Sequence, residues 1–285
     1  MKKEDEKAVE ATRNSGYFME QIKGRVRKIV VINPKQFKVI AGSVKKTDEN
    51  DAKVIAKYLR HGLLPEVRQM SKENRELKSL IKTRDKLVNL RRGLKNKIHN
   101  ILNDNGIVSQ KEMFSSEKSL ERLEGLSLSE TVKFEIRIIV EQIRSLSKSI
   151  KEIEEKIKDI GSGLKGQKNL TSITGIGELS SAIILSGIGD IEKFEDSKKL
   201  CSYVGIVSRV RNTGDKKSSG HITLMGNKIV RTTLVQVALT AVKYKEHLRS
   251  FYYRLKVKKG SESDNSNSQK DVGNNIQHIK KRLGI

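Results

Sequence analysis

Two long runs of apolar residues at heptad spacing constrain the fold of this chain more than any other feature. The first run extends from Arg75 to Leu102, and its seam repeats every seven residues at Leu80, Leu87, Leu94 and Ile101. The second run extends from Val132 to Ile160 and keeps the same three- and four-residue steps without a break. This period predicts two long amphipathic helices. The polar segment 103–129 between them allows an antiparallel hairpin, or the pairing of each helix with a second chain. An ordinary helix bundle and an extended coiled coil need the same seam.

The region before the first heptad run has the pattern of a small α/β unit. The run Lys28–Asn33 is rich in β-branched residues and stops at Pro34, which predicts a short buried strand. We expect helices on both sides of it, at Glu4–Ile22 and Asp48–Arg60.

The region after the second heptad run predicts another globular unit, which we expect to be mainly helical. It begins near Leu170 and contains an apolar helix from Leu179 to Ser186. Beyond Gly260 the sequence is polar and almost free of core-forming residues, so we expect a disordered tail. The fold class is therefore α/β followed by a mostly α region.

The charge balance of the chain indicates a polyanionic partner. The sequence has 58 Lys and Arg against 34 Asp and Glu, a net charge of +24. Nucleic acid is favoured over an anionic membrane or a merely well-solvated surface, because the chain has no Trp and no basic amphipathic helix typical of membrane binding. The one cysteine, Cys201, excludes an internal disulfide and indicates a reducing cytoplasm. Without an apolar run of about 20 residues or a signal core, we expect a soluble cytoplasmic protein without a membrane partner.

The positive charge is concentrated near the C-terminus. Between Gly205 and Gly260 there are thirteen Lys and Arg against two acids, and we expect DNA to bind there, with contacts from Arg209, Arg211, Lys216, Lys217, Lys228 and Arg231. The segment from Arg209 to Thr223 is rich in glycine, hydroxyl groups and cations, and is predicted to be a loop. Such a loop suits phosphoryl transfer through a hydroxyl nucleophile, but it equally suits phosphate binding without covalent chemistry.

A Gly-Ile-Gly turn precedes the apolar helix. Gly175 and Gly177 have the spacing of a helix-hairpin-helix turn, whose backbone N–H groups bind DNA phosphates. A purely structural tight turn has the same sequence.

Two aspartates stand three residues apart at the expected helix start of Asp48–Arg60. Asp48 and Asp51 would lie on one helix face, where a divalent metal ion would relieve their repulsion. Helix capping is the alternative explanation, and the spacing alone favours it.

An ordered set of motifs resembles the DEDD transposases of bacterial insertion sequences, of the IS110 type (the IS116/IS110/IS902 group) and their IS1111 relatives. The motifs are Val9-Glu10-Ala11-Thr12, Val31-Ile32-Asn33-Pro34, Lys46-Thr47-Asp48-Glu49-Asn50-Asp51-Ala52, Gly175-Ile176-Gly177, Tyr203-Val204-Gly205-Ile206-Val207, Gly220-His221-Ile222-Thr223 with Gly226-Asn227, and Leu248-Arg249-Ser250-Phe251-Tyr252. They occur in the family's order.

The resemblance implies four regions. These are a partial RuvC-like (RNase H-like) nuclease domain at 1–65, a coiled-coil or helical hairpin section at 66–165, a C-terminal transposase domain at 166–260 and the tail at 261–285. It also implies DNA cleavage and rejoining with a guide RNA, by a homo-oligomer, dimer or tetramer, that assembles through the coiled coil.

The resemblance also assigns the catalytic residues. Members of the family hold Mg²⁺ with four acidic residues, of which Glu10, Asp48 and Asp51 match three, and this reverses our preference for capping at the aspartate pair. The first aspartate of the family has no match here, so we expect a shortened transposase that binds metal weakly. At the position of the nucleophilic serine stands Thr213, whose methyl group restricts its rotamers. The alternative is a non-catalytic remnant that still binds DNA or RNA.

Overall fold

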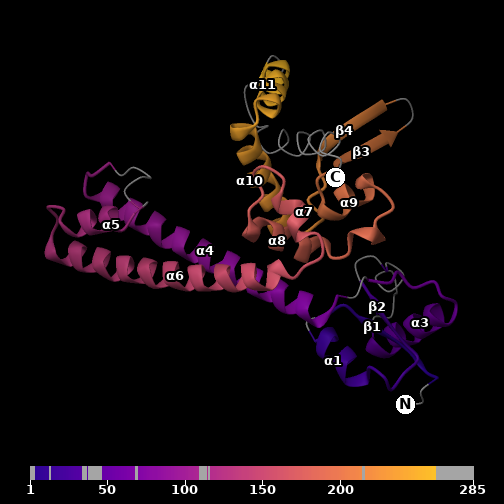
Figure 1. Ribbon diagram of the computed structural model, residues 1–285. Coiled ribbons are helices and arrows are strands. Elements are labelled where there is room, and N and C mark those ends of the chain that lie inside the picture. The colour runs from indigo at the N-terminus through magenta and orange to yellow at the C-terminus, as the bar shows by residue number, and fades with distance from the viewer. Residues whose placement is uncertain are drawn as a thin grey trace. The chain divides into compact units, whose positions relative to one another are not determined.

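The computed structural model describes residues 4–12, 14–33, 37, 47–67, 70–108, 114, 116–213 and 216–260 (Figure 1). For Arg209–Thr213 and Lys216–His221 it describes the backbone alone. The chain divides into two compact units, residues 1–71 and 72–285. The predicted finer division of residues 72–285 stays a prediction, and the expected disordered tail lies outside the described residues.

The first unit is a small α/β structure. Strand β1 (Glu6–Glu10) pairs in parallel with β2 (Lys28–Ile32), and helix α1 (Ser15–Ile22) connects them. Helix α3 (Asp48–Arg60) packs its apolar residues, including Val54 and Ile55, against Val30 and Ile32 of β2. Val31 is buried as well. Burial of successive strand residues on both faces explains the continuous apolar run of β2.

The prediction of one helix over Glu4–Ile22 is wrong in its first half. Residues Glu6–Glu10 form β1, although Glu, Lys and Ala favour helices. The full ladder to β2, extended by a bond from Ala11 N to Ile32 O of 2.8 Å, outweighs this local preference. The predicted strand at Lys28–Asn33 and helix at Asp48–Arg60 are confirmed.

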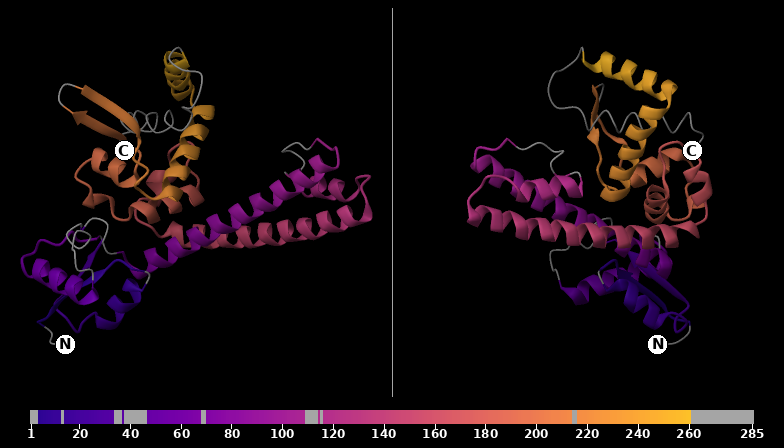
Figure 2. Two further views of the ribbon diagram at one scale, coloured as in Figure 1. Left: turned by 180° about the vertical axis from the view of Figure 1, so that it is seen from behind. Right: turned by 60° about the vertical axis from the view of Figure 1, so that its left-hand side comes forward.

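The two heptad runs form one antiparallel helical hairpin within the chain. Helix α4 (Lys72–Asp104) lies beside α6 (Glu130–Ser162) in every view (Figures 1 and 2). Leu77 and Ile81 belong to the same buried cluster as Ile157, while Ile98 lies in a second cluster with Ile136 near the other end of the hairpin. The heptad seam is therefore satisfied inside one molecule.

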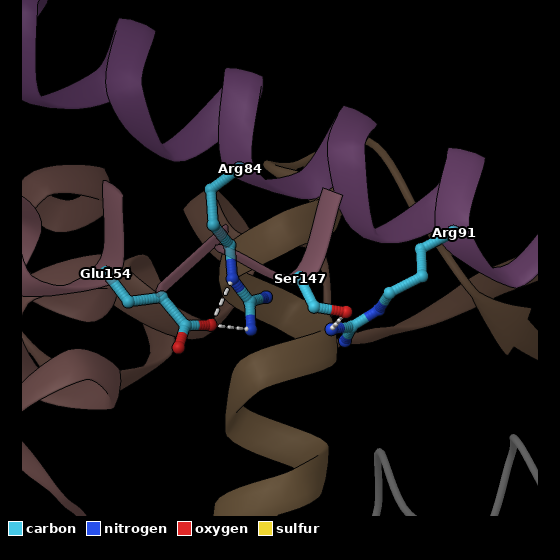
Figure 3. Close-up of polar contacts among 4 residues, drawn as sticks. All are labelled: Arg84, Arg91, Ser147 and Glu154. Carbon is cyan, nitrogen blue, oxygen red and sulfur yellow. Dashed lines mark hydrogen bonds and ion pairs between the residues drawn. The ribbon is translucent and has the colours of Figure 1, made fainter. Parts of the chain in front are cut away.

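Polar contacts join the two helices between these clusters (Figure 3). Arg84 donates from Nε (2.8 Å) and Nη2 (2.5 Å) to Oε1 of Glu154, and both side chains are partly buried, at 27% and 25% exposure. Arg91 donates to Oγ of Ser147 at 3.1 Å. Because both bonds connect α4 with α6, they fix the register of the hairpin.

The connection at the hairpin end contains a helix that the sequence analysis did not predict. Helix α5 (Glu117–Glu124) begins after the cap Ser116, whose Oγ accepts from Ser119 N at 3.3 Å. Its Leu120 and Leu123 pack into the cluster of Ile98 and Ile136. The segment is thus part of the core rather than a simple linker.

One apolar helix is the central element of the region after the hairpin. The chain continues through α7 (Gln167–Thr171), α8 (Glu178–Ile188), the 3₁₀ turn η2 (Ile191–Lys193), α9 (Ser197–Val204), strands β3 (Ser208–Thr213) and β4 (Lys216–Ile222), α10 (Lys228–Tyr244) and α11 (Glu246–Gly260). Helix α8 confirms the predicted apolar helix and contacts α4, α6, α7 and α10. An apolar helix of this kind belongs in a core.

Two close contacts hold α8 in place. A Cβ at Gly161 of α6 would lie 2.4 Å from Ala182 Cβ, and a Cβ at Gly187 of α8 would lie 2.1 Å from Val230 Cγ2 of α10. Glycine at these two positions allows the helices to approach closely. The hairpin and the C-terminal helices therefore share one core around α8.

Candidate nucleic-acid interface and acidic site

The predicted acidic residues lie at element ends of the first unit. Glu10 is the last residue of β1, at the carboxyl edge of the parallel strands, where α/β proteins often place functional groups. Asp48 and Asp51 occupy the first turn of α3, which packs next to β1. Asp48 is exposed, while Glu10 and Asp51 are half-buried.

Neither aspartate caps helix α3, although both lie in its first turn, where a carboxylate interacts favourably with the helix dipole. The cap is Thr47, whose Oγ1 accepts from Asn50 N at 3.3 Å. Within the described part of the chain, the carboxylates of Glu10, Asp48 and Asp51 have no hydrogen-bond or ion-pair partner. They are therefore available to a ligand.

These carboxylates have the chemistry for a magnesium ion, but they are not seen as a complete site. Carboxylate oxygens are the hard donors that Mg²⁺ prefers. Among the described residues, however, no three His, Cys, Asp or Glu side chains are arranged to hold a metal ion. The metal-binding function of Glu10, Asp48 and Asp51 stays a prediction.

The two glycines of the Gly-Ile-Gly turn differ in their surroundings. Gly175 has φ of +96°, and a Cβ there would lie 3.0 Å from both Ala241 N and Val237 O of α10. Gly177 is exposed and is the N-cap of α8, which starts with the bond from Ser181 N to Gly177 O. Gly175 thus has a packing function, whereas Gly177 stands where free N–H groups face outward. Phosphate binding at the turn stays a prediction.

The predicted loop between Arg209 and Thr223 is wrong, because this segment is a β-hairpin. Strands β3 and β4 pair antiparallel, with Thr213 opposite Lys216 and Arg211 opposite Ser218. Residues directly opposite each other share a face of the ladder. By register, Arg211, Thr213 and Lys216 therefore belong to one face, and Thr213 lies at the end of its strand next to the turn. Arg209 precedes Val210 in β3, and Lys217 pairs with Asn212.

The sequence contains a signal for this hairpin. Gly214 and Asp215 separate two runs with several β-branched and hydroxyl residues, and a Gly-Asp pair between such runs is typical of a two-residue hairpin turn. The many cations, hydroxyl groups and glycines of the segment favour a loop when composition alone is considered.

The base of the hairpin is fixed by two crossing backbone segments. Thr223 N donates to Val207 O at 2.9 Å, and Leu224 N donates to Gly205 O at 3.3 Å. A Cβ on Gly226 would lie only 2.2 Å from Val204 O, so the two segments cross in contact. This crossing explains why the motifs around Gly205 and Gly226 require glycine.

Arg231 stabilises the same crossing. Its Nη1 donates to Val204 O (3.4 Å) and to Gly226 O (3.5 Å). Partial burial lowers the pKa of its guanidinium. Arg231 therefore has a structural function that its predicted DNA contact did not include.

Lys228 has no such structural function. It is exposed in the first turn of α10, whose cap Asn227 accepts from Ile229 N at 3.0 Å. Lys228 and Arg231 stand three residues apart, so they are neighbours on the helix surface. Their contact with DNA stays a prediction.

Helix α4 carries a second concentration of positive charge, which the predictions above do not include. This helix has ten Lys and Arg against four acids, whereas α6 has seven of each. The heptad pattern drew attention to the apolar seam, and a count of charges for each helix is the signal that identifies the difference.

No described helix combines the length and the apolar character that crossing a bilayer requires.

Comparisons with known proteins match both parts of the chain. Residues 167–253 match the model of the transposase IS116/IS110/IS902 family, and residues 2–106 match a transposase model of the DEDD IS110 group. The chain is 25% identical over 235 residues to the transposase for insertion sequence element IS1111A of Coxiella burnetii. It is 23% identical over 243 residues to a probable family 20 transposase of Pseudomonas aeruginosa. These alignments include 80% and 83% of this chain, and they span 64% and 71% of the two relatives.

Proposed function

Because the chain belongs to the IS116/IS110/IS902 transposase family, we propose that it binds DNA and cuts and rejoins DNA strands during transposition of an insertion sequence. The observation that carries this proposal is that one family group matches the acidic unit and also the cationic C-terminal part. The β1–α1–β2 unit with α3 supports a partial RuvC-like domain.

In the proposed reaction the first unit supplies the metal ligands. Glu10, Asp48 and Asp51 would hold a divalent ion, for which we propose Mg²⁺. When bound, this ion would neutralise charge on the phosphate that reacts. The carboxylates of these three residues have no hydrogen-bond or ion-pair partner among the described residues, which supports this function.

The β-hairpin supplies the nucleophile in this proposal. The Thr213 hydroxyl oxygen forms a bond to phosphorus, the bond from phosphorus to a deoxyribose oxygen breaks, and the hydroxyl proton passes to that leaving oxygen through a base. The product is a phosphoester between Thr213 and DNA. Arg211 and Lys216 belong to the same face of the ladder by register and would stabilise the charge on the phosphate.

A covalent adduct tests the proposal. Full-length protein is incubated with labelled element-end DNA, Mg²⁺ and RNA from the element, and the adduct is detected on denaturing gels. We expect an adduct with the wild type, none with Thr213→Val, and more with Thr213→Ser, which removes the crowding methyl group.

The acidic residues have a matched control on the same helix turn. Asp51→Asn should abolish the adduct and leave DNA binding unchanged, whereas Glu49→Gln should react normally because Glu49 pairs with Lys53 at 2.6 Å. Equal adduct yields from wild type, Thr213→Val and Asp51→Asn would disprove these assignments.

We also propose a guide RNA and a homo-oligomer, either a dimer or a tetramer, as partners. Phe134 and Ile138 support an oligomer, because they lie one turn apart on α6 with exposures of 56% and 42%. Light scattering with Phe134→Ser and Ile138→Ser should show the loss of the assembly.

A second candidate is a protein that binds nucleic acid without cutting it. The arrangement of Glu10, Asp48 and Asp51, which are not grouped as metal ligands among the described residues, favours this alternative. It predicts salt-sensitive DNA binding with no adduct under any metal condition.

A further inference from the structure

A groove of about 870 Å³ lies along the middle of the helical hairpin. Its lining includes Lys82, Lys86, Leu90 and Gly93 of α4, together with Leu146 of α6 and Ile229 of α10. Leu90 is 50% exposed although it lies between the two buried clusters of the hairpin. The groove therefore presents an apolar floor to the outside.

Gly93 is the feature that packing within the chain does not explain. It lies in the interior of α4, where glycine is less favourable than alanine. Apart from its chain neighbours and the nearby backbone of α4, no described atom lies within 4 Å of a Cβ built on it, in contrast to the crowded Gly161. A glycine with open space in front of it allows close approach of a ligand to the helix backbone.

The cations of the groove are not neutralised. Lys82 and Lys86 are exposed and one helix turn apart, and neither has an ion-pair partner in the described residues. Asp85 also lines the groove and carries one negative charge, and its carboxylate accepts from Asn89 Nδ2 at 3.2 Å, so the two lysines leave a net positive charge there. Arg92 donates in turn to Asn89 Oδ1 at 3.2 Å.

The groove also continues toward the cationic C-terminal region. Ile229 lines it and follows Lys228 directly, at the start of α10. Lys228 is exposed and lies next to Ile229 in the sequence, so the end of the groove at α10 adjoins a further positive charge. This continuity favours a long anionic ligand over a small one.

We propose that this groove binds the sugar–phosphate backbone of duplex DNA, which passes over Gly93 between the lysines of α4 and Lys228. The inference rests on the proposed DNA-binding function. None of the described residues that line the groove is aromatic, whereas single strands and RNA loops are usually bound by stacking on aromatic rings. Lysines one turn apart suit successive phosphates, and the leucines suit deoxyribose.

The decisive variant is Gly93→Ala in the full chain. Alanine should raise the melting temperature by about 2 °C because it favours the helix. The same substitution should weaken binding of a labelled element-end duplex about fivefold. A purely structural glycine would not give a more stable protein that binds less well.

The lysines are tested with a charge-matched control. Lys82→Gln with Lys86→Gln should weaken duplex binding about tenfold and reduce the slope of log K against log salt by about 2. Lys148→Gln with Lys151→Gln removes the same charge from exposed positions of α6 outside the groove, and should change binding less than threefold.

Three outcomes would overturn the inference. In the first, the groove variants bind duplex DNA as the wild type does, which leaves the proposed function intact. In the second, they lose binding of a single strand or of RNA but not of the duplex. In the third, Gly93→Ala changes the oligomeric mass in light scattering, which would assign the groove to a second copy. A wild type that binds no DNA would instead reject the proposed function itself.

Discussion

Gly161 gives the sharpest prediction at the scale of single residues. Gly161→Ala would place a Cβ 2.4 Å from Ala182 Cβ, which is fixed to the backbone of α8. We expect a loss of about 1–3 kcal/mol in the free energy of unfolding, although alanine favours helices. Urea unfolding measures the change. Gly93→Ala is the control, since it adds the same methyl group in open space and should stabilise by roughly 0.5–1 kcal/mol. Equal effects of the two substitutions would disprove the close α6–α8 contact.

Substitutions of Arg231 and Lys228 should distinguish a residue that stabilises the fold from one that acts only at the surface. Arg231→Met leaves the carbonyls of Val204 and Gly226 without this donor and should lower the free energy of unfolding by about 1 kcal/mol. Lys228→Met should leave stability unchanged because Lys228 is exposed. Thermal unfolding measures the stability of each variant, and DNA binding at fixed salt measures its surface function. Unchanged stability of Arg231→Met would show that its carbonyl bonds contribute nothing.

The function of a single residue could be predicted where it depends on neighbours in the sequence. It could not be predicted where it depends on contacts with distant residues. Capping rules allow Thr47 or Asp48 as the cap of the helix at Asp48–Arg60, and in the structure the cap of α3 is Thr47. The contact of Gly226 with Val204 joins residues 22 positions apart in the sequence, so no local pattern indicates it. The metal and nucleophile assignments stay predictions, because they came from resemblance.

The ion pair Arg84–Glu154 carries the prediction at the scale of elements. Glu154→Gln should destabilise the hairpin by about 1 kcal/mol, because it leaves a partly buried guanidinium without its carboxylate. Asp159→Asn, which breaks the exposed pair with Lys156, should cost less than about 0.5 kcal/mol. A double-mutant cycle with Arg84→Met gives the coupling energy from urea unfolding. A coupling near zero would mean that the pair does not fix the register.

The long elements were predictable from period, while the short ones depended on their partners. The heptads located α4 and α6 to within a few residues, because a long seam repeats the same signal many times. Strand β1 has only five residues and is defined by pairing with β2. Helix α5 has eight residues and is stabilised by packing on α6 and by the ion pair between Glu117 and Arg144. The residues that pair with β1 and pack against α5 are distant in the sequence, so the local sequence does not indicate them.

The net charge of +24 carries the prediction at the scale of the whole molecule. If about six phosphates are contacted, DNA affinity should fall by about a thousandfold between about 50 and 200 mM salt. Fluorescence anisotropy with a labelled duplex at several salt concentrations measures the slope. The same titration with unrelated DNA separates general from specific binding. An affinity that does not change with salt concentration would disprove the phosphate contacts.

The burial of α8 sets a rule for building chimaeras from this chain and its relatives. Since α6 touches α8 at Gly161 and Ala182, and α8 touches α10 at Gly187 and Val230, a cut between residues 162 and 178 would divide a shared interior. A transplanted hairpin must bring its own α8 and the matching face of α10. Grafts that exchange the hairpin alone should fail to fold, whichever DNA the donor protein recognises.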